Sequence, residues 1–294
     1  MDRERRDRIV NHVLFVPAIL SSVVLFVMAG ILLLKSEQIL SITPLLSLLL
    51  SSSWRPLAGQ FGFLPFIMGT IWVTGLAMAI SIPVSLLSAI YLSEYAHAKV
   101  RGVIQPLIDL LAGVPSVVYG LFGILLIVPL IKEQVAPFFG TTSSGYCVLA
   151  GGLILAIMVF PILISLTFEV LRTVPLEMRE ASLGIGATRW ETIKHVVLRK
   201  ASPGILAVII LGFSRAFGET MAVLMVVGNV ARVPGSVFDP AYPLPALIAN
   251  NYGEMMSIPV YDSALMFAAL LLLVVVVIFN VAARLVLLRL RAVG

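Results

Sequence analysis

Arg215 and Glu219 are the residues of this chain whose types and spacing point most directly to chemistry, because both lie within an otherwise apolar run. Charged side chains are costly inside a membrane-spanning helix, and they usually face a bundle interior or a water-filled path. A spacing of four residues predicts that both lie on one face of one helix. They could neutralise each other as a salt bridge, but Arg before Glu is the less favourable order for such a pair. We therefore favour a functional pair.

The guanidinium of Arg215 suits a tetrahedral oxyanion, since its planar fork can donate two parallel hydrogen bonds. The carboxylate of Glu219 would repel an anion unless that anion carries a proton. Phosphate at neutral pH carries one and sulfate does not, so Glu219 could accept a hydrogen bond from phosphate and reject sulfate. Thr220, the next residue, is the third candidate on this path.

A second candidate site lies in the basic segment 171–203. Pro175 can start a helix at its first turn, and the glycines that follow predict a bend. Thr188, with Glu191 three residues later, predicts a capping box at the start of a second helix. Such a hairpin either links two spans or forms a rigid lever that a cytoplasmic partner can push. The candidate docking residues are Glu180, Ala181, Ser182, Leu183, Gly184 and Gly186.

The remaining reactive residues do not indicate an enzyme. The sequence has no Gly-x-x-x-x-Gly-Lys-[Ser/Thr] motif, so we expect it to bind no ATP through a P-loop of its own. His12, His97 and His195 are scattered, and none has a second ligand at metal spacing, so we expect no metal site. Cys147 is the single cysteine, and we expect it to behave as a small buried hydrophobe.

The composition places these residues in a membrane. The chain is 60% hydrophobic and 12% charged, whereas a soluble domain would be about a quarter charged. We expect an all-α, polytopic bundle of six transmembrane helices, because a span needs about 20 apolar residues. The first apolar run is too long for a cleaved signal peptide, so we expect an uncleaved anchor. The predicted spans lie near 9–34, 67–92, 106–131, 147–170, 204–228 and 263–284.

Basic residues orient these spans. With both ends inside the cell, fifteen Lys and Arg residues lie on the cytoplasmic side and four lie outside. Because cytoplasmic loops carry the excess of Lys and Arg, this bias predicts an N-in, C-in topology. The net charge of +5 is thereby explained, and we expect no nucleic-acid partner.

The spans divide the chain into segments. A basic N-terminus (1–8) and the first span (9–34) precede an extracytoplasmic loop (35–66). A five-helix core (67–290) and a short cytoplasmic tail (291–294) follow. The core contains a second extracytoplasmic loop, 229–262, with five prolines. Each outer loop could fold into short interfacial helices, contact a partner, or serve as a plain connector.

The basic loop resembles the EAA loop of ABC-importer permeases, in which Glu-Ala-Ala and a later Gly are followed by Ile-x-Leu-Pro. Glu180, Ala181 and Gly186 match this pattern, whereas Ser182 replaces the second alanine and Arg199 the final proline. In that family the loop docks into a groove on a cytoplasmic ATPase. The resemblance therefore implies the type I ABC importer permease fold, with this segment as its coupling loop.

Three further stretches are similar to phosphate-specific permeases. They lie at 212–229, 110–120 and 60–70, and the resemblance spans roughly 54–290. The form Gly-Glu-Thr-Met-Ala at 218–222 points to the C-type subunit (the PstC family) and not to its A-type partner.

This resemblance implies a set of partners. They are a paralogous A-type permease in a heterodimer, two cytoplasmic ATPase subunits that hold ATP and Mg, and an extracytoplasmic phosphate-binding protein. This chain would then bind no cofactor and would lie in the cell membrane of a prokaryote. Arg215, Glu219 and Thr220 would lie on the translocation path of phosphate.

Three alternatives stay open. A proton-coupled carrier or an anion channel could use the charged pair, although neither has an ATPase for the EAA-like loop to dock. The same ABC architecture could import another oxyanion, such as molybdate or sulfate. A role in sensing phosphate could accompany transport, and it has no separate mark in the sequence.

Overall fold

The computed structural model describes residues 3–253 and 258–293. Across these residues every regular element is a helix, apart from two isolated β-bridges. Six helices are long and apolar enough to cross a membrane, which confirms the predicted all-α bundle. These spans are Val13–Lys35, Leu64–Tyr95, Ser116–Phe138, Val148–Arg172, Arg189–Gly218 and Pro259–Leu285.

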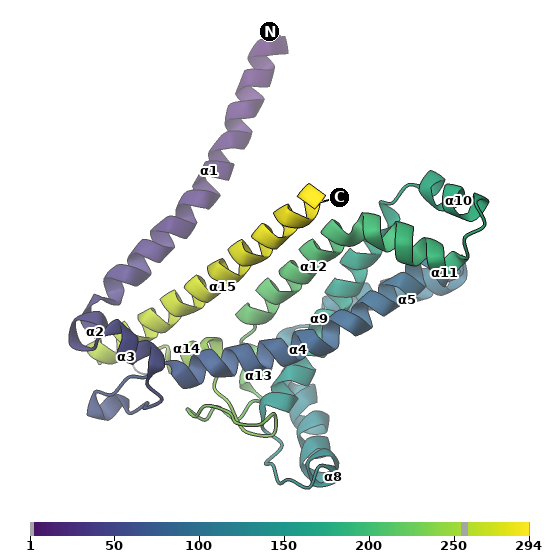
Figure 1. Ribbon diagram of the computed structural model, residues 1–294. Coiled ribbons are helices and arrows are strands. Elements are labelled where there is room, and N and C mark those ends of the chain that lie inside the picture. The colour runs from purple at the N-terminus through teal and green to yellow at the C-terminus, as the bar shows by residue number, and fades with distance from the viewer. Residues whose placement is uncertain (1–2, 254–257, 294) are drawn as a thin grey trace.

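Several spans are assembled from consecutive helical pieces, as Figure 1 shows. The 3-10 turn is η1, and the π-turns are η2 to η5. In chain order the elements are α1 (Arg3–Lys35), α2 (Glu37–Ile42), α3 (Leu45–Leu50), η1 (Pro56–Ala58), α4 (Leu64–Ile90), η2 (Tyr91–Tyr95), α5 (Ala98–Ala112), α6 (Ser116–Phe122), η3 (Gly123–Ile127), α7 (Val128–Leu130), η4 (Ile131–Val135), α8 (Ala136–Phe138), α9 (Val148–Arg172), α10 (Leu176–Gly184), α11 (Arg189–Thr192), η5 (Ile193–Val197), α12 (Leu198–Gly218), α13 (Met221–Leu224), α14 (Leu244–Asn251) and α15 (Pro259–Val293).

The centre of the molecule is α4 packed against α9, with α12 and α13 completing the same core. Small side chains on both central helices, such as Ala77, Ala150 and Ala156, are fully or almost fully buried. Lipid gives helices no hydrophobic reason to associate, so close van der Waals packing across small residues holds such a pair together.

The outer loop 35–66 forms part of the packed structure and is not a plain connector. It folds into α2 and α3 and then brings Trp54 against the ring of Phe66 at 4.8 Å and that of Tyr261 at 6.0 Å. Edge-to-face aromatic pairs of this kind favour a fixed geometry. The loop therefore ties the outer ends of α4 and α15 together.

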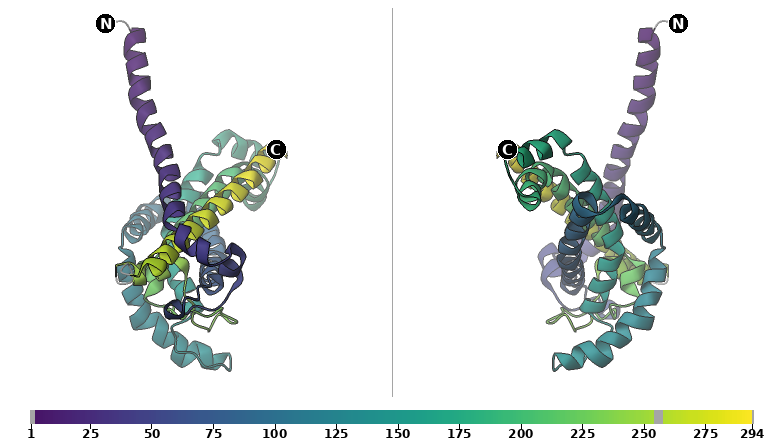
Figure 2. Two further views of the ribbon diagram at one scale, coloured as in Figure 1. Left: turned by 90° about the vertical axis from the view of Figure 1, so that its left-hand side faces the viewer. Right: turned by 90° about the vertical axis from the view of Figure 1, so that its right-hand side faces the viewer.

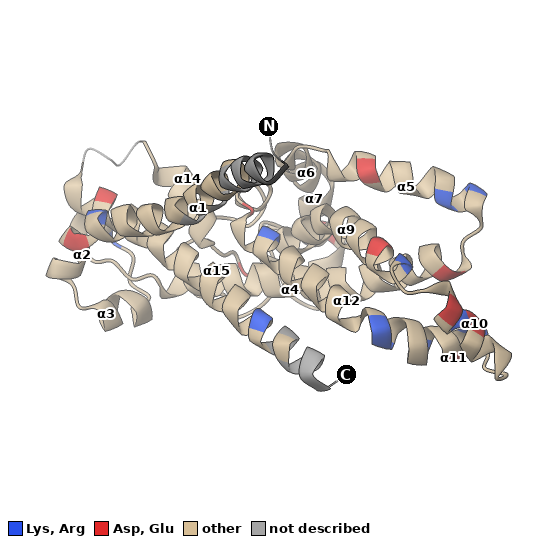
Figure 3. Cartoon of the chain, turned by 90° about the horizontal axis from the view of Figure 1, so that it is seen from above, with Lys and Arg blue, Asp and Glu red and all other residues tan. Residues whose placement is uncertain are grey.

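Helix α1 extends away from the rest of the chain in all three ribbon views, and its C-terminal end lies beside α2 and α15 (Figures 1 and 2). No residue in its most apolar window is buried by the rest of the chain. Both termini and α10 lie toward one end of the molecule, and α2, α3 and α8 lie toward the other. Seen from above, the positions of Lys, Arg, Asp and Glu are concentrated around α2 and around α5, α10 and α11, with few on the helices between them (Figure 3).

The predicted third span, 106–131, begins too early. The helix breaks at Pro115, and the span itself is Ser116–Phe138. Proline disfavours helical backbone at the residue before it. The residues ahead of the break form α5, a separate helix that carries Lys99 and Arg101.

The predicted fifth span, 204–228, begins and ends too late. Its helical part starts at Arg189, so the second helix expected in the coupling loop is the start of the span itself. It ends at Gly218, and Glu219 is extended, with φ −71° and ψ 127°. The prediction that Arg215 and Glu219 share one helix face is therefore wrong.

Candidate functional site

The three residues predicted for a substrate path lie together at the break between α12 and α13. Arg215 is in the last turn of α12, and Glu219 and Thr220 follow the end of that helix. Arg215 is exposed in the single chain, whereas Glu219 and Thr220 are half-buried. A guanidinium at this position of a span is costly in lipid, so its face must meet water or another protein chain.

Arg215 and Glu219 do not neutralise each other. Among the described residues the ion pairs are Arg179–Glu94 at 3.1 Å and Arg232–Asp239 at 3.9 Å, and neither includes this pair. The alternative of a self-contained salt bridge is therefore not what the structure contains. The positive charge of Arg215 stays available to a group from outside the chain.

Glu219 has a structural contact of its own. Its Oε1 atom accepts a hydrogen bond from the backbone N–H of Ala222 at 3.2 Å, which satisfies one of the free amides at the start of α13. Its Oε2 atom accepts no hydrogen bond within the part of the chain that the structure describes. One oxygen of the carboxylate is thus engaged and the other is open to a ligand.

A small cavity beside Glu219 connects this break to α4. Thr70 and Thr74 of α4 line it, together with Pro243 and Pro245 of the outer loop. The hydroxyl of Thr70 donates to the Phe66 carbonyl at 2.7 Å and accepts from Leu244 N–H at 2.9 Å, so it fixes the loop against the span. The cavity walls therefore combine fixed polar groups with one carboxylate.

The break is held by α6, which carries part of the stretch similar to phosphate permeases. Gly120 faces α13 so closely that an added Cβ would lie 3.3 Å from the Cα of Ala222 and would overlap the sulfur of Met225. Tyr119, its neighbour, donates its hydroxyl to the Leu111 carbonyl at 2.7 Å. The requirement for glycine here is a requirement for close helix approach.

Sequence reasoning missed one polar link at this site. Ser214 donates to the side chain of Asn280 at 2.9 Å and so connects α12 to α15. Asn280 is an isolated amide within a long apolar run, and this feature of the sequence could have indicated a polar contact inside the bundle. The bond fixes the rotation of α12 just before Arg215.

The candidate docking residues lie on and after α10. Glu180, Ala181, Leu183, Gly184 and Gly186 are exposed, and Ser182 is half-buried. The hydroxyl oxygen of Ser182 lies 2.9 Å from that of Thr192, a hydrogen bond that a second alanine at this position of the EAA pattern could not form. The short helix is therefore available at the surface and attached on one side.

The turn after α10 has the geometry that the sequence predicts. Gly186 has φ +92°, which L side chains rarely adopt. The capping box at Thr188 and Glu191 is also confirmed, because the Thr188 hydroxyl accepts from Glu191 N–H at 3.3 Å and the Glu191 carboxylate accepts from Thr188 N–H at 2.8 Å. These two devices fix the angle between α10 and α11.

Large apolar side chains around this turn are exposed. Ile185 is 88% exposed, and Leu176, Leu183 and Trp190 are each about half exposed. An apolar patch on an otherwise polar end of a protein marks an interaction surface.

The other residues singled out in the sequence do not join either site. Cys147 is fully buried at the outer end of α9, and burial raises the pKa of its thiol. Within the described residues no three His, Cys, Asp or Glu side chains are grouped so that they could hold a metal ion. His12 lies among residues whose side chains are not described.

Comparison with known proteins gives one family. The family described as "Binding-protein-dependent transport system inner membrane component" matches residues 81–292. A "Probable ABC transporter permease protein YqgH" of Bacillus subtilis is 35% identical over 96% of this chain and 90% of that protein. A "Phosphate transport system permease protein PstC" of Xylella fastidiosa is 37% identical over 82% of this chain and 78% of that protein.

Solved structures agree in fold. A chain of a bacterial alginate ABC transporter aligns with a TM-score of 0.63 at 14% identity and covers 96% of each chain. A chain of the MetNI methionine ABC transporter aligns with a TM-score of 0.60 at 16% identity, over 81% of this chain and 99% of that one. At such identities the likeness concerns the fold alone.

Proposed function

The chain belongs to the family of binding-protein-dependent transport system inner membrane components, and from this premise we propose that it is the permease subunit of an ATP-driven importer of inorganic phosphate. It is a multi-pass membrane protein and a transport subunit, not an enzyme. We infer the substrate from relatives that share a third or more of their residues with this chain, because these relatives are named as phosphate transport permeases.

The site chemistry supports the same substrate. Arg215 offers an unpaired guanidinium for two charge-assisted hydrogen bonds to an oxyanion. Glu219 keeps one open carboxylate oxygen, which accepts a hydrogen bond from an anion that still carries a proton. Thr220 adds a hydroxyl at the same break. We assign these three residues to the translocation path.

Membership of the family implies a second permease, an ATPase and a binding protein as partners. We assign the second permease to a paralogous A-type subunit, whose helices would cover the exposed Arg215 face and the exposed side chains of α1. An extracytoplasmic phosphate-binding protein would deliver the anion at the opposite end from α10.

We assign ATP and Mg to two cytoplasmic ATPase subunits, with α10 and its turn as their docking element. Exposed Ile185 and Leu183 supply apolar contacts, and Glu180 supplies a charge at the same surface. Closure of the ATPases on ATP would move α10, and the spans would alternate between outward and inward access.

The test is phosphate uptake into proteoliposomes that contain all four components, with and without internal ATP. Wild-type uptake should require ATP, and Arg215→Gln should lower it about 100-fold, because a charged hydrogen bond contributes about 1.5–3 kcal/mol. Arg284→Gln, an exposed arginine of α15 outside the coupling loop, is the matched control and should transport normally.

Each other outcome overturns a different part of the proposal. Uptake driven by a proton gradient without ATP would replace the importer with a secondary carrier. Uptake of molybdate or sulfate in preference to phosphate would change the substrate. ATP-dependent phosphate uptake that ignores Arg215→Gln would keep the importer and remove the proposed site.

A further inference from the structure

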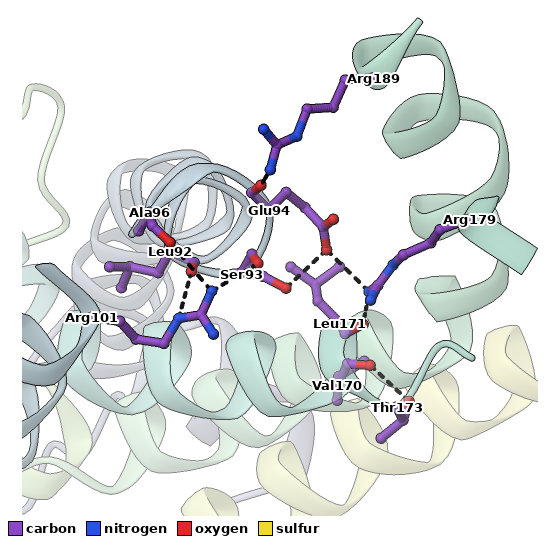
Figure 4. A network of polar contacts seen from close by, with 10 residues as sticks. All are labelled: Leu92, Ser93, Glu94, Ala96, Arg101, Val170, Leu171, Thr173, Arg179 and Arg189. Carbon is purple, nitrogen blue, oxygen red and sulfur yellow. Dashed lines mark hydrogen bonds and ion pairs between the residues drawn. The ribbon is translucent and has the colours of Figure 1, made fainter. Parts of the chain in front are cut away.

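The cytoplasmic end of α4 is a π-turn, η2, on which arginines from three other elements converge (Figure 4). Arg101 comes from α5, Arg179 from α10 and Arg189 from α11. π-turns are uncommon and often lie at functional positions in helices. The last carbonyls of a helix lack partners within it and carry partial negative charge, so arginine is well suited to bind them.

Arg179 ties α10 to two spans at once. Its Nη2 atom lies 3.1 Å from Oε1 of Glu94, and the two side chains are only 20% and 10% exposed. The same nitrogen donates to the Leu171 carbonyl at 2.9 Å, at the cytoplasmic end of α9. Ser93 also donates to the Glu94 carboxylate at 2.9 Å. A shift of α10 would therefore pull on α4 and α9 together.

The other two arginines hold the backbone of the same turn. Arg101 donates to the Leu92 and Ser93 carbonyls, both at 3.2 Å. Arg189 donates to the Glu94 carbonyl, and its guanidinium lies 4.8 Å from the centre of the Tyr95 ring. The contact between Arg179 and Glu94 differs from these, since it joins two side chains, and Glu94→Gln weakens it without removing any of the backbone bonds.

The pair is not completely satisfied. The Nε atom of Arg179 is buried and has no hydrogen-bond partner within the described residues. A buried ion pair is weak support for stability by itself, because desolvation offsets much of its attraction. An apolar contact would hold α10 in place equally well. The presence of an ion pair at this position therefore favours a role in the movement of α10.

Helix α4 leads from this turn to the candidate path. It runs unbroken from Ile90 back to Leu64, and Thr74 and Thr70 on it line the cavity that Glu219 borders. Glu94 lies twenty residues beyond Thr74, which is about 30 Å along a helix that rises 1.5 Å per residue. Pro83 lies inside this helix, but α4 is packed against α9, so a displacement at one end can reach the other.

We propose that Glu94 and Arg179 are the positioning pair through which a displacement of α10 reaches α4 and, through it, the Glu219 cavity. This inference rests on the proposed function, since it needs an ATPase that moves α10. Neither residue touches the substrate. They make the cytoplasmic end of α4 move together with α10 while the cavity alternates between outward and inward access.

The first test measures coupling in the reconstituted complex. Arg179→Gln and Glu94→Gln should leave assembly and ATP hydrolysis within about 2-fold of wild type but lower phosphate taken up per ATP about 10-fold, a typical size for coupling between two sites. The double variant should be no worse than Arg179→Gln alone, because Arg179→Gln already removes the ion pair that Glu94→Gln breaks. Arg172→Gln, an exposed arginine at the end of α9, is the matched control.

Two results of this test would overturn the proposal. Unchanged uptake per ATP in both variants would show that the link is not needed. Hydrolysis and uptake that fall in proportion to lost assembly would show that the pair is only a structural fastening.

A second measurement does not depend on the substrate. Spin labels at Glu177→Cys on α10 and Leu87→Cys on α4, in a Cys147→Ala background, report the distance between the two helices. With the ATPase bound, this distance should stay constant with and without ATP in wild type and should vary in Arg179→Gln. A wild-type distance that changes with ATP, or an Arg179→Gln variant that behaves as wild type, would overturn the proposal. If the wild-type complex took up no phosphate, the proposed substrate would be wrong, but this distance test would still be valid.

Discussion

Glu219 illustrates how one side chain at the break can have two separate roles. One carboxylate oxygen caps α13 through Ala222, and the other is open. An amide in its place can keep the capping bond, because its carbonyl oxygen is still an acceptor. The role in selecting an anion can therefore be tested without removing the cap.

We predict that Glu219→Gln retains phosphate uptake but loses discrimination against sulfate. Without the negative charge, an anion that carries no proton is no longer repelled. The selectivity ratio, measured as sulfate competition with labelled phosphate in proteoliposomes, should fall about 10-fold, which corresponds to about 1.4 kcal/mol. Glu177→Gln, an exposed carboxylate of α10, is the control. An unchanged ratio would remove Glu219 from the selection of the anion.

Cys147 should be inert in the folded protein. Its side chain is fully buried, and burial raises the pKa of its thiol, so the reactive thiolate is scarce at neutral pH. A maleimide should label the purified protein several-fold faster in denaturing detergent than in mild detergent, as followed by mass spectrometry. Equal rates in both detergents would contradict the buried position.

Gly186 and Gly184 form a natural comparison at the scale of the helices. Gly186 has φ +92°, whereas Gly184 ends α10 without a positive φ and has open space around it. Gly186→Ala should strain the turn by about 1–3 kcal/mol and reorient α10. Gly184→Ala should be neutral or slightly stabilising, since alanine favours a helix.

The measurement for this pair is ATP-dependent uptake together with co-purification of the ATPase. We expect Gly186→Ala to lower both uptake and ATPase co-purification about 10-fold, because the docking surface changes shape. We expect Gly184→Ala to leave both unchanged. The same effect from both substitutions would mean that space, and not backbone conformation, matters at this turn.

The sequence predicts helices better than it predicts their ends. Apolar runs located six spans, and Thr188 with Glu191 located a helix start, because both signals are local. The break at Gly218 was missed, since apolar residues continue through Val227 and an apolar run does not register a change of backbone direction. The break at Pro115 was readable from proline chemistry and was outweighed by the apolar run.

At the scale of the whole molecule, the unpredicted part is what joins segments distant in sequence. The Glu94 and Arg179 pair is separated by 85 residues, and nothing in the local pattern of either residue indicates the other. The aromatic contact between Trp54 and Tyr261 joins residues that lie still farther apart in the sequence. A single sequence identified the candidate residues, but only the fold shows which of them act on one another.

The N-in, C-in topology gives a prediction for the whole chain. In a Cys147→Ala background, Leu57→Cys should react with a membrane-impermeant maleimide on intact cells, because Leu57 is 94% exposed in the outer loop. Ile185→Cys, at a position 88% exposed on the other side, should react only after permeabilisation. The reverse pattern would invert the topology and the position of the docking helix.

An unassembled copy of this chain is energetically distinct from an assembled one. Alone in the bilayer it would hold the exposed guanidinium of Arg215 against lipid, at a cost of about 2.5–3.5 kcal/mol. Surplus copies should therefore distort their helices or draw water into the bilayer around Arg215. Pairing with a second permease chain over Arg215 would remove this cost, so the chain should be more stable inside an assembly than alone.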